Sequence, residues 1–171
     1  MEFRELLDKR FSARTYTSVE VDESAVQEML EAVKAAPSAG NLQSYHVVVV
    51  RDSDKKQKLA DASGPQGWIA KAPVVFAFFA DMTKFCSRYS NTCHPTMSTQ
   101  DATIAIAYAQ LAAANLGLGS CWVGPFAADD AQEICGLEGD LVFAGLLTLG
   151  HTAESQTRRK RRNESEWTTY I

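Results

Sequence analysis

The run QDATIAIAYAQLAAANLGLG, residues 100–119, constrains the fold more than any other part of the sequence. It predicts a helix that is apolar on nearly every side, contains many small residues and is stopped by Gly117 and Gly119. Such a helix has to lie at the centre of the protein. Because the chain has only 171 residues, burial within one subunit competes with burial beneath a second subunit, and we favour a dimer.

Helices and strands alternate along the rest of the chain. Buried strands are predicted at residues 45–50, 74–80 and 141–150, with a shorter strand from residue 120 and helices near residues 2–8, 23–36, 53–61 and 128–135. The strands are apolar at successive positions, so we expect helices on both faces of the sheet. Since the sequence shows no repeat, low-complexity tract or linker, we expect a single domain over residues 1–171.

The balance of charge and hydropathy favours a small-molecule partner. The formal net charge of −4 gives no overall attraction to nucleic acid or to an anionic membrane. No run approaches the ~20 apolar residues that span a bilayer, and the first residues, MEFRELLDKRF, lack the pattern of a signal peptide. We therefore expect no nucleic-acid or membrane partner and a cytoplasmic location.

The four cysteines indicate neither a disulfide framework nor a metal site. Cys86, Cys93, Cys121 and Cys135 form no C-x-x-C pair, and we expect reduced, mostly buried thiols. Cys93 and His94 are neighbours, but they lack paired ligands at the spacing of a zinc site. We therefore expect no bound metal.

Arg10, Ser12 and Arg14 form the first candidate binding segment. Alternate side chains of an extended backbone point the same way, so these residues would present two guanidiniums and a hydroxyl on one side. The donor fork of arginine suits phosphate or carbonyl oxygens. A solvated charged loop is the alternative, and the spacing alone favours that alternative.

The second candidate segment is APSAGNLQ, residues 36–43, between a predicted helix and a predicted strand. Its small residues would let a flat ligand approach the backbone, and the amides of Asn41 and Gln43 both donate and accept hydrogen bonds. The pyrimidine edge of a flavin alternates donors and acceptors and would suit such amides. An ordinary helix-to-strand turn is the alternative.

The third candidate segment is RRKRR, residues 158–162. Such a run fits a solvated face, a nucleic-acid patch or a source of phosphate contacts. The sequence has no G-x-G-x-x-G after a strand, P-loop, H-E-x-x-H or G-x-S-x-G motif. GLGS, residues 117–120, follows a helix and would cap its end. Recognition of a phosphate group would therefore have to come from side chains.

Five segments, taken in order, resemble the nitroreductase family of FMN-dependent NAD(P)H oxidoreductases. They are RFSARTY, APSAGNLQSYHVVVV, APVVFAFFAD, QDATIAIAYAQLAAANLGLGSCWVGPF, and LTLGHTAES followed by the basic run, and they span nearly the whole chain. The resemblance implies an α+β fold with a central mixed, largely antiparallel sheet flanked by helices. It also implies an intertwined homodimer with FMN at the interface, where both subunits line each site.

The resemblance further implies roles for individual residues. Arg10 and Ser12 are similar to the family's phosphate and ribityl contacts, and Arg14 lies where a cation faces the N1 and O2 side of the flavin. A K-x-R phosphate clamp would fall within Arg158 to Arg162, with its register open. The implied cofactor-binding set is Arg10, Phe11, Ser12, Arg14, Pro37, Ser38, Ala39, Asn41, Gln43, Gln66, Val123, Gly124, Lys160 and Arg162.

Within this set, the residues from Pro37 to Gln43 would line the flavin ring with Gln66, and Val123 and Gly124 would meet it near N5. The sequence also departs from the family pattern. Many relatives have Q-P-W where this chain has the triplet QSY at residues 43–45, and the connection over residues 61–72 is short. These departures affect the assignment of Gln66 as a flavin contact and the expected shape of the acceptor pocket.

The reaction that the resemblance implies is ping-pong. A hydride passes from NADH or NADPH to flavin N5, and electrons then pass to a small acceptor such as a nitroaromatic, a quinone or a flavin. The cofactor carries the chemistry, so we nominate no catalytic side chain. Residues Lys84 to Thr99 show no clean period and are predicted to form a long loop or a short irregular helix. They could form a substrate lid, with His94 or Tyr89 on the acceptor.

Three other functions stay open at this point. The chain could be an FMN-binding sensor or carrier with little turnover. It could process flavin or halides on the same scaffold, although it lacks the extra length such activities usually need. The basic run could also bind nucleic acid.

Overall fold

The computed structural model describes residues 1–124, 128–156 and 160–171. The helices are α1 (Phe3–Lys9), α2 (Glu23–Lys34), α3 (Ser53–Ala62), α4 (Trp68–Lys71), α5 (Met82–Arg88), α6 (Pro95–Asn115) and α7 (Ala128–Cys135). The strands are β1 (Tyr45–Val50), β2 (Val74–Asp81), β3 (Gly119–Val123) and β4 (Leu141–Gly150). Short 3-10 turns lie at Ala39–Asn41, Ser90–Thr92 and Glu164–Glu166.

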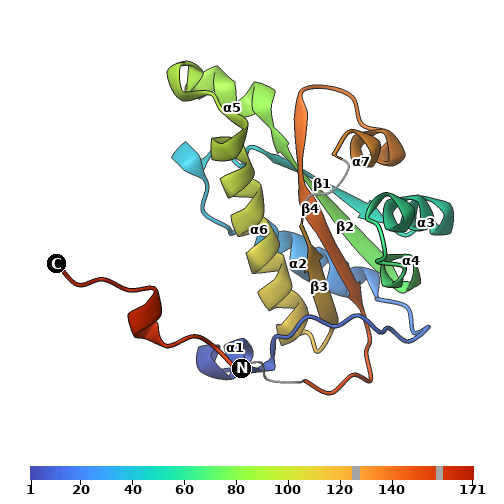
Figure 1. The fold of residues 1–171 in the computed structure, drawn as a ribbon. Helices are drawn as coiled ribbons and strands as arrows, with labels where there is room; N and C mark the ends of the chain where they lie inside the picture. The colour runs from blue at the N-terminus through green and yellow to red at the C-terminus, as the bar shows by residue number, and fades with distance from the viewer. Residues whose placement is uncertain (125–127, 157–159) are drawn as a thin grey trace.

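The four strands form one sheet in the order β1-β2-β4-β3, and each neighbouring pair is antiparallel. α2 and α6 cover one face, and α3, α4 and α7 cover the other (Figure 1). β2 is apolar at successive positions because Phe76 and Phe78 lie on the face covered by α2 and α6, whereas Phe79 lies on the opposite face and packs on Phe143. The expected α+β fold with a largely antiparallel sheet between helices is confirmed. Outside the four strands, the described residues also include one isolated bridge, between Ser12 and Ser120, and this bridge is parallel.

The central helix α6 begins five residues before its predicted start. Pro95 occupies the first turn, and the His94 side chain caps the helix by accepting the Thr96 N–H at 3.2 Å. The segment from Lys84 to Thr99 is therefore mostly helical, formed by α5, a 3-10 turn and the first turn of α6. Although α6 is apolar, no helix in the described ranges has the length and hydropathy to cross a membrane.

α6 is buried toward the sheet and open on the other side. Ala102, Ala105 and Ala109 are completely buried, whereas Met97 and Tyr108 are 45% and 38% exposed. The expectation of a helix buried on nearly every side is thus not met within one subunit. An open apolar stripe on the longest helix leaves a face that a second subunit could cover.

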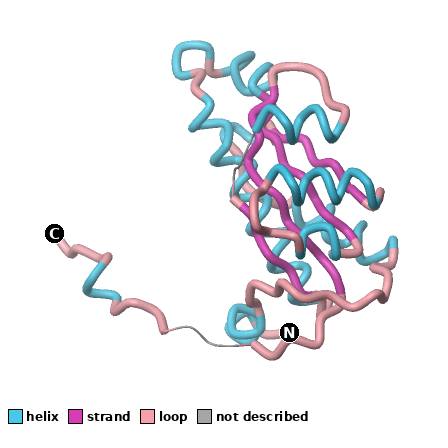
Figure 2. The backbone as a smooth tube through the Cα atoms, turned by 45° about the vertical axis from the view of Figure 1, so that its right-hand side comes forward, coloured by secondary structure: helices cyan, strands magenta, loops and turns pink. Residues whose placement is uncertain are grey.

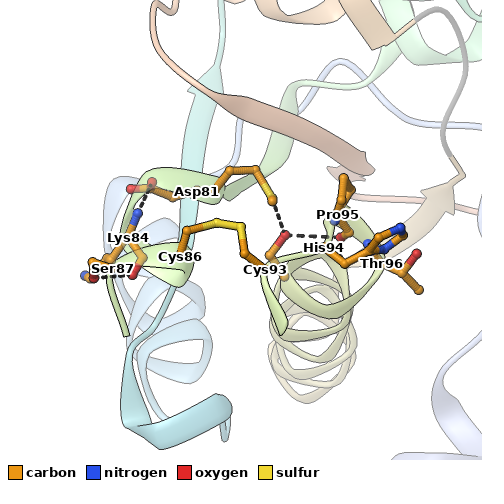
Figure 3. Close-up of a disulfide and its surroundings, with 10 residues drawn as sticks. Asp81, Lys84, Cys86, Ser87, Cys93, His94, Pro95 and Thr96 are labelled. Carbon is orange, nitrogen blue, oxygen red and sulfur yellow. Dashed lines mark hydrogen bonds between the residues drawn. A yellow bond between two sulfur atoms is a disulfide. The ribbon is translucent and has the colours of Figure 1, made fainter. Parts of the chain in front are cut away.

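The expectation of four reduced thiols is wrong for two of them. Cys86 in α5 and Cys93 just before α6 form a disulfide, with Cα atoms 5.0 Å apart. The chain reverses direction between the two helices and brings the cysteines to bridging distance (Figure 3). Cys121 and Cys135 are free and buried, as expected.

The C-terminal tail projects from the body of the subunit. Residues 160–171 point away from the sheet and its covering helices in both views (Figures 1 and 2). The tail exposes Trp167, Tyr170 and Ile171. Large apolar side chains on an extended arm add to the surface that this subunit leaves uncovered.

Candidate functional site

Residues 10–14 leave α1 as an extended segment that lies against β3. Ser12 forms a bridge with Ser120, and the Ala13 N–H donates to the Ser120 carbonyl oxygen at 3.0 Å. Ala13 is completely buried, whereas Arg10, Ser12 and Arg14 all line an adjoining cavity. Arg10, Ser12 and Arg14 thus line one cavity, but the intervening Phe11 lines it as well, so the lining does not follow the predicted alternation alone.

The cavity has a volume of about 930 Å³ and is lined by Leu7, Asp8, Arg10, Phe11, Ser12, Arg14, Ala153, Glu154, Ser155, Gln156 and Arg161. One wall is α1 with the segment that follows it, and the other is the chain after β4. Three guanidiniums and two carboxylates line the walls, and the size falls in the range of small-molecule sites. Arg161 extends the guanidinium set that the sequence placed at residues 10 and 14.

Backbone and side-chain contacts fix the two walls against each other. The Arg14 N–H donates to Glu154 Oε2 at 2.9 Å, and the Thr152 hydroxyl donates to the Thr15 carbonyl oxygen at 2.7 Å. The Gln156 amide donates to the carbonyl oxygen of Asp8. These contacts join residues far apart in sequence, so the cavity is set by the fold of the whole domain.

Cys121 lies beneath the arginine segment as a neutral group. Burial raises the pKa of its thiol, while Arg14 and a hydrogen bond with Ser12 oppose that rise. The thiol is therefore protonated near neutral pH. Because the thiol is neutral, it forms no ion pair with the nearby guanidinium of Arg14.

The second candidate segment, residues 37–43, has an unusual backbone. Gly40, Asn41 and Gln43 have positive φ values of 54°, 55° and 49°. Such values cost energy for residues other than glycine and are maintained only where the surroundings hold them. The Gln43 N–H donates to Ser38 Oγ at 2.9 Å, and the Gln43 amide donates to the Asn41 carbonyl and side-chain oxygens at 3.1 and 3.2 Å.

Asp101 of α6 holds this segment from the inside. It is 4% exposed, and its carboxylate accepts the Ala39 N–H at 3.0 Å and the Ser44 hydroxyl at 2.9 Å. Sequence reasoning did not single out Asp101. The available signal was that Asp101 is the sole charged residue in residues 100–119, because a carboxylate in an apolar helix requires partners.

The two candidate segments lie far apart within one subunit. Residues 37–43 contact α6 at Asp101, whereas the arginine segment meets Ser120, which follows the other end of α6. The helix from Asp101 to Asn115 spans roughly 20 Å. The described residues that line the arginine cavity include no member of the 37–43 segment. One chain therefore does not bring the two halves of the candidate set together.

The remaining candidates lie elsewhere on the subunit. The Gln66 amide donates to the Ser63 carbonyl oxygen at 3.1 Å, and nearby Trp68 has the Arg14 guanidinium 5.7 Å above its ring. Val123 ends β3 and is buried, and Gly124 follows it. The other two candidates, Lys160 and Arg162, lie in the tail and line a second hollow of about 280 Å³. Arg158 and Arg159 fall outside the described residues.

The chain matches known proteins in sequence and in fold. The Nitroreductase family profile matches residues 7–67 and 62–151. The FMN reductase [NAD(P)H] of Bacillus subtilis (strain 168) is 32% identical over an alignment that covers 92% of this chain and 68% of that protein.

Two solved structures show the same fold. The FMN-dependent nitroreductase from Clostridium difficile R20291 is 28% identical with a TM-score of 0.77, covering 94% of this chain and 92% of that one. The NADPH:FMN oxidoreductase from Vibrio harveyi, complexed with NAD+, is 24% identical with a TM-score of 0.88. The match covers 98% of this chain and 76% of that one. The family match over most of the chain and the relative at 32% identity agree with this fold. The chain belongs to the nitroreductase family of oxidoreductases.

Proposed function

We propose that this protein is an FMN-dependent oxidoreductase that transfers electrons from NADH or NADPH to a small acceptor such as a nitroaromatic or a quinone. One observation carries the proposal. The chain builds an arginine-lined cavity at one end of α6 and a strained, amide-bearing loop near the other end. These are the two kinds of surface that a phosphate group and a flavin ring require.

The arginine cavity fits the phosphate end of FMN. Arg10, Arg14 and Arg161 line it together with the Ser12 hydroxyl. Guanidinium forks form paired, charge-assisted hydrogen bonds with phosphate oxygens. The carboxylates of Asp8 and Glu154 line the same space, and Glu154 accepts a backbone N–H of the arginine segment. The three arginines outnumber the two carboxylates, so the cavity lining carries a net positive charge that favours a dianionic phosphate.

Residues 37–43 fit the ring of the cofactor. Pro37 and Asn41 are exposed, so the backbone on either side of Gly40 is open to a flat ligand, while Arg88 and Tyr89 lie against Gly40 itself. Because the Gln43 amide nitrogen already donates to Asn41, the Gln43 oxygen is positioned to accept from a ring N–H. When bound, FMN would supply the two-electron chemistry, and the protein would supply binding, orientation and electrostatics.

A homodimer would join the two halves. A two-fold axis perpendicular to α6 would pair the open stripes of two α6 helices in antiparallel orientation, so that the loop end of one lies beside the arginine end of the other. The stripe exposes Met97, Ile104 and Tyr108, and α1 adds exposed Phe3 and Leu7. Each composite site would then take its phosphate cavity from one copy and its ring-binding loop from the other.

The test is the visible spectrum of the purified protein, followed by anaerobic addition of NADH and then NADPH. The proposal expects flavin bands that bleach with at least one nicotinamide and recover when a quinone is added. Bands that persist with both donors would instead support an FMN-binding sensor or carrier. The absence of flavin bands even after FMN is added would contradict the cofactor assignment.

A further inference from the structure

We propose that Cys86 and Cys93 form a dithiol–disulfide exchange site whose redox state sets how firmly residues 37–43 are held. Its substrate class is a dithiol reductant, either a small molecule or a protein. The importance of residues 37–43 rests on the proposed function, whereas the exchange chemistry does not. The bridge joins the last turn of α5 to the residue before the cap of α6.

The disulfide is open to solvent on one side. Cys93 is exposed and Cys86 is partly buried, whereas the free cysteines Cys121 and Cys135 are buried. Figure 3 shows the bridge at the corner between α5 and the start of α6, beside Ser87 and His94. A reductant can therefore reach the sulfur of Cys93 without unfolding the sheet or opening the core.

The exchange balances without a metal or a further oxidant. A thiolate of the dithiol attacks the Cys93 sulfur, the bond between the two cysteines breaks, and the Cys86 sulfur leaves with the electron pair and takes up a proton. The second thiol of the reductant then attacks the mixed disulfide. The products are two protein thiols and the disulfide of the reductant, a transfer of two electrons and two protons.

The chain reversal that the bridge closes carries the side chains resting on residues 37–43. A β-carbon built on Gly40 would lie 2.7 Å from the Tyr89 hydroxyl oxygen and 3.1 Å from Arg88 Nε. The Tyr89 ring in turn packs on buried Phe85, with ring centroids 5.2 Å apart. The disulfide therefore restrains Arg88 and Tyr89 in the positions where they cover Gly40.

Reduction would release one of the restraints on the loop. Another restraint, from the side of α6, is Asp101, which accepts the Ala39 N–H and the Ser44 hydroxyl. Cleaving the bridge leaves those hydrogen bonds in place but frees the reversal between α5 and α6. The expected change is a local loosening of residues 37–43, with the sheet unaffected.

The first measurement maps the thiols of the native full-length chain by alkylation and mass spectrometry, before and after incubation with dithiothreitol. We expect Cys86 and Cys93 to become alkylated after reduction while Cys121 and Cys135 stay protected. If Cys86 and Cys93 stay unmodified in the folded protein, or if all four cysteines react together, the exchange site is overturned.

The second measurement follows hydrogen exchange at the Ala39 and Gln43 amides. Reduction should speed their exchange at least roughly fivefold, the lower end of couplings between distinct sites. In the double variant Cys86→Ser/Cys93→Ser, these amides should exchange as fast as in the reduced protein, and the reductant should not change their rate. In Ser87→Ala, reduction should speed exchange as it does in the wild type. Equal exchange in oxidised and reduced protein would overturn the inference. Failure of both forms to bind FMN would overturn only the proposed function, because neither measurement uses flavin.

Discussion

Single residues hold the strained backbone of the candidate site. Asn41 and Gln43 occupy the left-handed region, which costs roughly 1 kcal/mol or more at each position. Ser38 and Asp101 accept the backbone N–H groups that fix this conformation. The loop is therefore shaped before any ligand arrives, and its shape depends on a carboxylate buried in α6.

Removing the Asp101 carboxylate should destabilise the protein. Asp101→Ala would leave the Ala39 N–H and the Ser44 hydroxyl without their acceptor, at a cost of about 2 to 4 kcal/mol. Urea unfolding monitored by circular dichroism measures this loss. Asp54→Asn, on the exposed side of α3, is the matched control and should change stability by less than ~0.5 kcal/mol. Equal stability of Asp101→Ala and wild type would contradict the assigned role.

Removing one guanidinium from the arginine cavity should weaken FMN retention. Arg10→Ala or Arg14→Ala would each delete charge-assisted hydrogen bonds to a phosphate, which corresponds to roughly a tenfold or greater rise in Kd. Fluorescence titration with FMN gives the Kd. The control is Arg51→Ala, whose side chain pairs with Glu20 and Glu23 outside the cavity. Unchanged affinity in both cavity variants would rule out this phosphate site.

Cys135 should make the protein less stable at alkaline pH. Burial raises the pKa of its thiol from 9.0 to about 11, so the unfolded chain loses this proton at a lower pH than the folded chain does. The stabilising contribution is complete below pH 9 and is lost as pH rises through about 11, up to roughly 2 kcal/mol. Urea unfolding across this range should show a shallower decline for Cys135→Ala. Identical declines would refute the assignment.

At the scale of elements, the apolar strands and the short helices α1 and α7 could be predicted from sequence, whereas α4 and the early start of α6 could not. β2 and β4 are runs of buried residues on both faces, which leave a continuous hydrophobic pattern. α4 has only four residues, too few to show a period. The early start of α6 depends on a proline and a histidine cap, and these lie in a polar stretch that resembles a loop.

The candidate site likewise has one part that local sequence predicts and another part that it does not. The arginine segment is extended, so a period of two in the sequence groups Arg10, Ser12 and Arg14, but it does not account for Phe11, which lines the same cavity. The partners of Asp101 lie 57 and 62 residues away, and the disulfide depends on a chain reversal. Both arise from through-space contacts that local spacing does not encode. Each was found in the structure alone.

Close contact between residues 10–14 and β3 should require glycine at position 119. A β-carbon there would lie 2.9 Å from the Ala13 β-carbon and 2.6 Å from Thr152 Cγ2. Gly119→Ala should therefore push the arginine segment off β3, cost about 1 to 3 kcal/mol and weaken FMN binding. Gly67→Ala is the matched control, because a β-carbon at Gly67 meets nothing within 4 Å. Thermal unfolding and FMN titration of both variants decide the point, and wild-type behaviour of Gly119→Ala would count against it.

At the scale of the whole molecule, the subunit has an incomplete surface. α6, α1 and the tail together expose apolar side chains, including Phe3, Tyr108 and Trp167. The two halves of the candidate site lie toward opposite ends of α6. A two-fold dimer with its axis perpendicular to α6 would cover this apolar surface and would also place each arginine cavity beside the loop of the other copy.

The central claim, a site shared between two copies, is tested most directly by complementation. One copy carries Arg10→Ala/Arg14→Ala, and the other carries Asn41→Gly/Gln43→Gly, which removes the amides while glycine keeps the positive φ. Two different affinity tags allow the mixed dimer to be purified. The account predicts that neither parent retains FMN and that the mixed dimer binds a single FMN, because one of its two sites combines both intact halves. A mixed dimer without FMN, or a protein that forms no dimer, would contradict the account.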